Sequence, residues 1–214
     1  MQIKSIFNSI ENTGNRQGKI IKNVKVAPCN LECSYCGQTH CSKDDEFTVM
    51  EVDAILDEVA DLGINYVTIT GGEPVLQRDL PELVAALLEE GDKVNIETNG
   101  SALLEPFENK MTDILSDDEL VNNLIYTLDY KCENSGKLGD MVGENIPYLI
   151  DNDALQFTVS TTADMDIMKE VIDEYEPTAQ IFVIPLNIQP SLIVDYLNMH
   201  SIDARLQLPL RSQV

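Results

Sequence analysis

The sequence has few basic residues and no tryptophan. Its 214 residues include 37 aspartates and glutamates but only 14 lysines and arginines, which gives a net charge of −23 at pH 7. Because no long cluster of lysine or arginine offsets this charge, direct binding to nucleic acid or to an anionic membrane is disfavoured. The acidity predicts either a well-solvated surface or a docking face for a basic protein partner.

The sequence also lacks long apolar runs, and its number of cysteines is odd. No run approaches the roughly 20 residues that cross a bilayer, and the opening residues do not form a signal-type apolar core. Three of the five cysteines fall within eight residues, which favours a metal or reactive site over a secreted disulfide framework. We therefore expect a cytoplasmic protein with reduced thiols and no attachment to a membrane.

No internal repeat, low-complexity tract or linker rich in proline, glycine or serine marks a boundary inside the chain. The hydrophobic fraction of 43% is typical of folded proteins. Residues 1–214 are therefore predicted to form a single domain.

Short β-type runs alternate with helical patterns along the chain. The expected strands are residues 22–26, 65–70, 94–98, 124–128, 155–160, 180–186 and 205–210. One helix is expected after Thr48 and Glu51, which have the spacing of a capping box, and it should end at Gly63. Further helices are expected at residues 79–90, 117–122, 164–175 and 191–199.

This succession predicts an α/β fold with a mostly parallel sheet and right-handed crossovers. A complete eight-stranded barrel typically takes about 250 residues. The shorter chain favours an open, single-domain partial (β/α)6-type barrel. In such folds, chemistry takes place at the carboxyl ends of the strands.

Three cysteines follow the first of these strands. Cys29, Cys33 and Cys36 have the spacing C-x3-C-x2-C. Three thiolates on one short loop can hold one face of a 4Fe-4S cluster and leave the fourth iron open to another ligand. A zinc loop is the alternative, although a closed structural zinc site needs a fourth ligand. The candidates for that ligand are His40, Cys41 and Cys132.

A glycine pair follows the strand at 65–70, in the segment Thr70-Gly71-Gly72-Glu73-Pro74. Two glycines at a strand end let backbone polar groups approach a ligand closely, because no β-carbon stands in the way. An ordinary strand-to-helix turn is the alternative interpretation of this segment alone.

Taken together, the cysteine spacing, the aromatic Tyr35 before the third cysteine and the glycine pair resemble the radical S-adenosylmethionine (SAM) superfamily. The resemblance implies that the open iron binds the amine and carboxylate of SAM, and that cleavage of SAM releases a 5′-deoxyadenosyl radical. It also implies that Tyr35 lies beside the adenine and that Gly71, Gly72 and Glu73 serve the SAM amino group.

Four further segments resemble the 7-carboxy-7-deazaguanine synthase family. They are residues 6–10 (IFNSI), 27–31 (APCNL), 96–100 (IETNG) and 128–131 (LDYK). The resemblance implies a lyase reaction in which the ring of 6-carboxy-5,6,7,8-tetrahydropterin contracts to give 7-carboxy-7-deazaguanine and ammonia. This is an early step toward queuosine and other deazapurines.

The same resemblance implies a role for each matching residue. The substrate-binding positions are Ile10, Glu11, Asn12, Lys25 and Thr70. The SAM-binding positions are Tyr35, Cys36, Gly37, Gly72, Asp129, Tyr130 and Lys131. The family's magnesium ligand corresponds to Thr39 if one residue is inserted and to Gln38 if none is, so the sequence leaves magnesium dependence open.

The chain departs from the family pattern at some of these positions. Residues 11–14 read Glu-Asn-Thr-Gly where the family has Gln-Gly-Glu-Gly. Lys25 replaces an arginine, which keeps the charge but loses the two-pronged grip on a carboxylate. The final residues lack the family's His-Lys pair. These changes predict weaker substrate binding or a different substrate.

Two other functions fit the same residues: a small radical SAM enzyme of the glycyl-radical activase type, and a non-catalytic protein that binds an iron-sulfur cluster or zinc. Both the synthase and the activase would need an external reductant such as flavodoxin or ferredoxin. Because many such reductants are acidic, the charge of −23 predicts weak long-range attraction between the two proteins. The resemblance also implies a homodimer.

Overall fold

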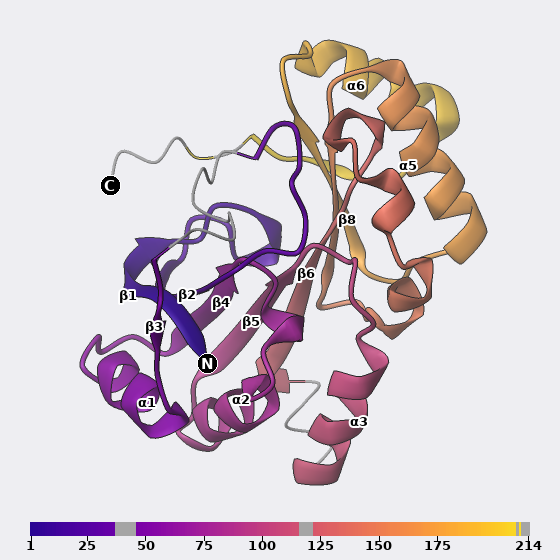
Figure 1. Ribbon diagram of the computed structural model, residues 1–214. Helices are drawn as coiled ribbons and strands as arrows, with labels where there is room; N and C mark the ends of the chain where they lie inside the picture. Colours follow the sequence, from indigo (N-terminus) through magenta and orange to yellow (C-terminus); the bar gives the residue numbers. More distant parts are fainter. Residues whose placement is uncertain (37–45, 116–121, 209, 211–214) are drawn as a thin grey trace.

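Nine strands form one sheet in the computed structural model, which describes residues 1–36, 46–115, 122–208 and 210 (Figure 1). From β2 onward every neighbouring pair is parallel, whereas β1 and β3 join one edge antiparallel. The sheet is open, since its edge strands β3 and β9 do not pair with each other. In spatial order the strands are β3 (Thr48–Val49), β1 (Gln2–Ile10), β2 (Ile20–Val26), β4 (Tyr66–Gly71), β5 (Lys93–Thr98), β6 (Leu124–Tyr130), β7 (Ala154–Val159), β8 (Gln180–Pro185) and β9 (Arg205–Leu206).

The α-helices given for the described residues lie along the outer side of this curved sheet (Figure 1). They are α1 (Val52–Ala60), α2 (Leu80–Glu89), α3 (Glu105–Ile114), α5 (Thr162–Tyr175) and α6 (Pro190–His200). The connection from β6 to β7 holds only the 3-10 turns η3 (Glu133–Ser135), η4 (Leu138–Asp140) and η5 (Gly143–Tyr148). The predicted α/β class, with a mostly parallel sheet in a partial barrel, is confirmed.

Some local predictions were wrong. Thr48 does not cap a helix, because pairing with Ile3 holds it in the extended strand β3, and no side chain caps α1. The sequence patterns also missed α3, in which only Phe107 and Met111 are buried, so its apolar stripe is too narrow to detect. The last predicted strand shortens to Arg205–Leu206, and most of the predicted helix at 117–122 lies outside the described residues.

The parallel strands alternate apolar and polar residues. Apolar residues such as Val24, Ile69 and Ile96 belong to the core that includes residues of the outer helices. The residues between them face the other side of the sheet, because successive side chains of a strand point to opposite faces. This inner face is polar and includes Asn23, Thr68, Asn95, Thr127 and Gln156. The interior of the partial barrel is therefore polar.

The connection between β1 and β2, residues 11–19, lies against the amino ends of the strands. Arg16 donates to the carbonyl oxygens of Lys93 and Val94 at the start of β5. The Gln207 side chain bonds both backbone polar groups of Gly14, which has φ +70°, and a β-carbon at Gly14 would lie 2.7 Å from Thr127 Oγ1. These contacts fix the connection beneath the polar interior.

Helix α5 begins with a capping box that also holds η3. The Asp164 carboxylate accepts hydrogen bonds from the backbone N–H groups of Ser160, Thr161 and Asn134, and the Thr161 hydroxyl accepts from the Asp164 N–H. Burial alone would raise the pKa of Asp164, but these hydrogen bonds outweigh it and hold the pKa below its usual value.

Replacing Asp164 with alanine should lower the free energy of unfolding by about 2–3 kcal/mol, because several buried donors lose a charged acceptor. Urea unfolding measures this. The matched control is Asp173→Ala, which removes an exposed ion pair with Lys169 and should cost at most about 1 kcal/mol. The Asp164 effect should shrink as the pH falls below the usual aspartate value of 3.8, because the unfolded state then binds a proton that the folded state, with its lowered pKa, does not yet bind. Equal losses in the two variants would contradict the capping role.

Candidate functional site

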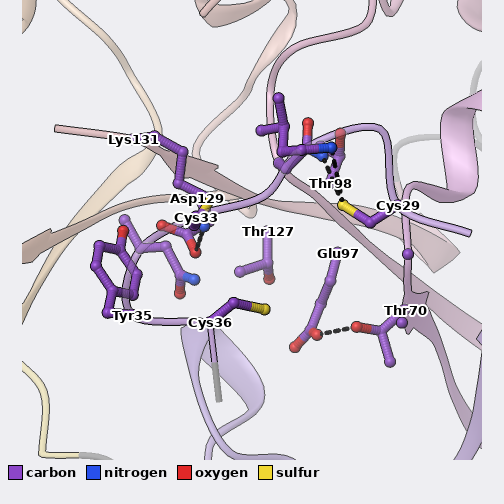
Figure 2. Close-up of a pocket in the computed structure, with 15 residues that line it drawn as sticks. Cys29, Cys33, Tyr35, Cys36, Thr70, Glu97, Thr98, Thr127, Asp129 and Lys131 are labelled. Carbon is purple, nitrogen blue, oxygen red and sulfur yellow. Dashed lines mark hydrogen bonds and ion pairs between the residues drawn. The ribbon is translucent and has the colours of Figure 1, made fainter. Parts of the chain in front are cut away.

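A pocket of about 230 Å³ opens where the strands β4 to β7 end (Figure 2). One wall is the loop that carries Cys29, Cys33 and Cys36. The rest is built from strand ends, including Thr70 on β4, Glu97 on β5 and residues of β6 and β7. The predicted location of the site at the carboxyl ends of the strands matches this pocket.

The cysteine loop is tied to two neighbouring segments. Asn99 donates from Nδ2 to Cys29 Sγ at 3.6 Å and to the side-chain oxygen of Asn30 at 3.0 Å. Ser34 donates from its backbone N–H to the carbonyl oxygen of Ser135 in η3 at 3.0 Å. Among the described residues none of the three cysteines is in a disulfide bond, and burial raises the pKa of Cys33. The loop therefore presents three separate thiols to one pocket.

The glycine pair provides the surface on which this loop begins. A β-carbon on Gly72 would lie 2.2 Å from the carbonyl oxygen of Pro28, the residue before the first cysteine. Gly71 has φ +107°, and a β-carbon there would lie 2.4 Å from the carbonyl oxygen of Val26. Both glycines also line the pocket. No other residue type allows both approaches at these positions.

Two predicted cofactor-binding side chains point elsewhere. Glu73 is fully buried and accepts hydrogen bonds from Thr98 Oγ1 at 2.8 Å and from the Asn99 N–H at 2.7 Å, so it joins the end of β4 to the end of β5. Tyr130 packs against the Phe157 ring, with ring centroids 5.7 Å apart. Neither residue lines the pocket.

Asp129, Lys131 and Tyr35 form one group in the pocket wall. Lys131 makes an ion pair with Asp129, and its Nζ lies 5.8 Å from the centroid of the Tyr35 ring. Burial alone would lower the pKa of Lys131, but Asp129 and Tyr35 raise it above its usual value. Among the described residues, the Tyr35 hydroxyl and Asp129 Oδ1 are buried without a hydrogen-bond partner. Such atoms suit a polar ligand.

Thr70 and Glu97 lie side by side at the pocket floor (Figure 2). The Thr70 hydroxyl donates to Glu97 Oε2 at 2.5 Å. Burial raises the pKa of Glu97 to about 8, and the negative charge of Glu11 beneath it contributes to the rise. In the sequence, the segment that contains Glu97 was interpreted only as a marker of the family. The alternation of polar and apolar residues along β4 and β5 was the signal that could have identified Glu97 as an inward-facing residue.

None of the remaining predicted site residues that the structure describes lines this pocket. Ile10 and Asn12 are exposed, and only Glu11 of that segment is buried. Lys25 has its Nζ 5.5 Å from the centroid of the Phe7 ring. The predicted positions Gly37 and Thr39, with the alternative ligands Gln38, His40 and Cys41, are outside the described residues.

Within the described part of the chain, no three histidine, cysteine, aspartate or glutamate side chains are placed to hold a single metal ion. In the same residues, none of the helices combines the length and the apolar character needed to cross a membrane.

Comparison with known proteins places the site in a family. Residues 27–117 match the model of the radical SAM superfamily. The chain is 33% identical to 7-carboxy-7-deazaguanine synthase of Clostridium acetobutylicum, over 95% of this chain and 91% of that protein. It is 34% identical to the protein of the same name from Methanospirillum hungatei, over 98% and 83%. The crystal structure of QueE from Escherichia coli shares the fold, with a TM-score of 0.77, 16% identity and coverage of 98% and 94%.

The open parallel sheet and the cysteine loop above its strand ends thus define a radical SAM enzyme, a class that uses a 4Fe-4S cluster and SAM. Within that class, the chain belongs to the 7-carboxy-7-deazaguanine synthase family.

Replacing Gly72 with alanine should displace the cysteine loop, because the new β-carbon would overlap the Pro28 carbonyl. We expect the loss of about 2–3 kcal/mol of stability and of most of the iron bound after anaerobic reconstitution. Urea unfolding and an iron assay measure the two effects. The control is Gly139→Ala, because a β-carbon at Gly139 would meet no atom within 4 Å. Full iron binding by the Gly72 variant would refute the supporting role of the glycine.

Proposed function

We propose that this enzyme converts 6-carboxy-5,6,7,8-tetrahydropterin to 7-carboxy-7-deazaguanine by ring contraction and releases ammonia, in the pathway to queuosine and related deazapurines. Relatives named 7-carboxy-7-deazaguanine synthase match nearly the whole chain. The observation that carries the proposal is the single pocket bounded by three thiols, a glycine pair and polar strand ends. No observation favours the activase or a non-catalytic binding protein over this function.

The three cysteines Cys29, Cys33 and Cys36 are the residues that would hold the cluster, because three thiols on one loop leave one iron open. The cluster and SAM together would supply a 5′-deoxyadenosyl radical. The unpartnered Tyr35 hydroxyl and Asp129 Oδ1 fit the polar groups of a nucleoside ligand. Gly71 and Gly72 expose backbone that a ligand can approach.

Thr70 and Glu97 would contact the substrate from the pocket floor. A site enclosed by strand ends and the cysteine loop also limits the access of water to reactive species. Lys25 is the nearest match to the cation expected to bind the substrate carboxylate, and it would have to leave the Phe7 ring to do so. Magnesium, if required, would be bound by Thr39 or Gln38.

Reconstituted enzyme, supplied anaerobically with reductant, SAM and the tetrahydropterin, should form 7-carboxy-7-deazaguanine that mass spectrometry detects. Cys29→Ala should abolish the product, whereas Cys132→Ala should retain it, because Cys132 is buried outside the pocket. Parallel reactions with and without magnesium decide the metal requirement. SAM cleavage without this product would overturn the substrate assignment.

We also propose an acidic flavodoxin or ferredoxin as reductant and a homodimer as the assembly. Because both redox partners would be negatively charged, cluster reduction should become faster as ionic strength rises. Stopped-flow absorbance measures the rate, and the cationic reductant methyl viologen should show the opposite dependence. A slower reaction with the protein reductant at high salt would count against repulsion between the partners.

A further inference from the structure

Two carboxyl groups meet beneath the pocket. Glu11, from the connection that lies against the amino ends of the strands, is only 2% exposed. It bonds Thr68 and Asn95, the inward-facing residues next to Thr70 and Glu97 on β4 and β5, and it raises the pKa of Glu97, which lines the pocket floor. Two adjacent carboxyl groups do not ionise together readily, because their like charges repel. The arrangement therefore favours a proton on one of the pair.

The two carboxyl groups differ in their hydrogen-bond partners. Glu11 Oε2 accepts hydrogen bonds from the Thr68 hydroxyl and from Asn95 Nδ2, and the Arg16 guanidinium exerts a favourable charge interaction on it. These partners hold the Glu11 carboxyl group in place beneath Glu97.

Glu97 has weaker support for a charge. It accepts one hydroxyl hydrogen bond from the described residues, from Thr70, and faces the negative groups Glu11 and Asp129. The nearby cations are engaged elsewhere, since Lys131 pairs with Asp129 and Lys25 lies over the Phe7 ring. The proton therefore belongs on Glu97, with burial and the charge of Glu11 as the causes.

Tyr35 and Lys131, which also line the pocket, are poor proton donors. Burial raises the pKa of Tyr35 above its usual value, and the pKa of Lys131 is also raised. The three cysteines are the candidate cluster ligands. A general acid works best when its pKa lies near the working pH, and Glu97, at about 8, meets that condition.

We propose that Glu97 is the general acid of the ammonia-releasing step, with Glu11 as the residue that keeps it protonated. This inference rests on the proposed function. As the carbon–nitrogen bond breaks, its electron pair stays on the departing amine nitrogen, which takes the Glu97 proton and leaves as ammonia. The proton lost from the adjacent ring carbon, whose C–H electrons form the new double bond, returns to the carboxylate. No further reactant is needed.

The test separates radical chemistry from ammonia release in the cluster-loaded enzyme. The substrate carries deuterium at C6, and the deuterium that appears in SAM measures hydrogen transfer from the substrate. An enzymatic assay measures the ammonia released. In Glu97→Gln, ammonia release should fall at least 100-fold, which is the size expected for the loss of a general acid. Label transfer should fall less than 10-fold. The matched control is Glu108→Gln, another partly buried glutamate with a raised pKa, which accepts a hydrogen bond from Tyr126 and does not line the pocket. It should change neither readout more than twofold.

The pH dependence tests the part played by Glu11. In the wild type, ammonia release should decline above about pH 8 as Glu97 ionises. Glu11→Gln removes a negative charge that raises the pKa of Glu97, so the decline should move to lower pH. A role of Glu11 in folding alone would leave the midpoint unchanged, and that result would overturn its assignment.

Infrared difference spectroscopy detects the protonated carboxyl group of Glu97 directly and does not need turnover. One protonated-carboxyl band that disappears between about pH 7 and pH 9 should be present in the wild type and in Glu108→Gln and missing from Glu97→Gln. Equal losses of label transfer and ammonia release in Glu97→Gln, or absence of the band from the wild type, would overturn the proposal. If the wild type releases no ammonia from this substrate, the proposed function is wrong. The catalytic role of Glu97 is then also wrong, even if the infrared band is present.

Discussion

The alternation of side chains along the parallel strands is the constraint on which the site depends. Each strand must present apolar residues to the helices outside, and the same pleat sends the intervening residues to the inner face. In this chain those inner residues are polar, from Asn23 on β2 to Gln156 on β7. A polar interior would be costly in a closed core, but here hydrogen bonds between strands and an open pocket satisfy many of its groups.

Local sequence patterns could predict the elements whose signals are contained within them. The cysteine loop and the strand at Tyr66–Gly71 are of this kind, because spacing and residue type alone mark them. The inward position of Glu11 could not be predicted in this way. It depends on contacts between the connection at 11–19 and distant segments, including the bond between Gly14 and Gln207. Likewise, Thr48 belongs to a strand only because Ile3 pairs with it.

The segment Gly71-Gly72-Glu73 shows why a motif does not assign its members one common role. The glycines line the pocket, and they also let the cysteine loop pass at a distance that any β-carbon would prevent. The Glu73 side chain turns away and joins two strand ends through Thr98 and Asn99. Asn99 in turn contacts Cys29. The carboxylate therefore positions the cysteine loop from outside the pocket.

The carboxyl pair imposes a cost on the fold that follows directly from proton linkage. Between the usual glutamate value of 4.5 and about 8, the folded chain keeps the Glu97 proton that the unfolded chain has released. Since the folded state then binds more protons, stability must decrease as the pH rises through this window. A buried amide at position 97 would avoid that loss and keep the hydrogen bonding. A carboxyl group whose raised pKa lowers stability at neutral pH is therefore better explained by its proton than by packing.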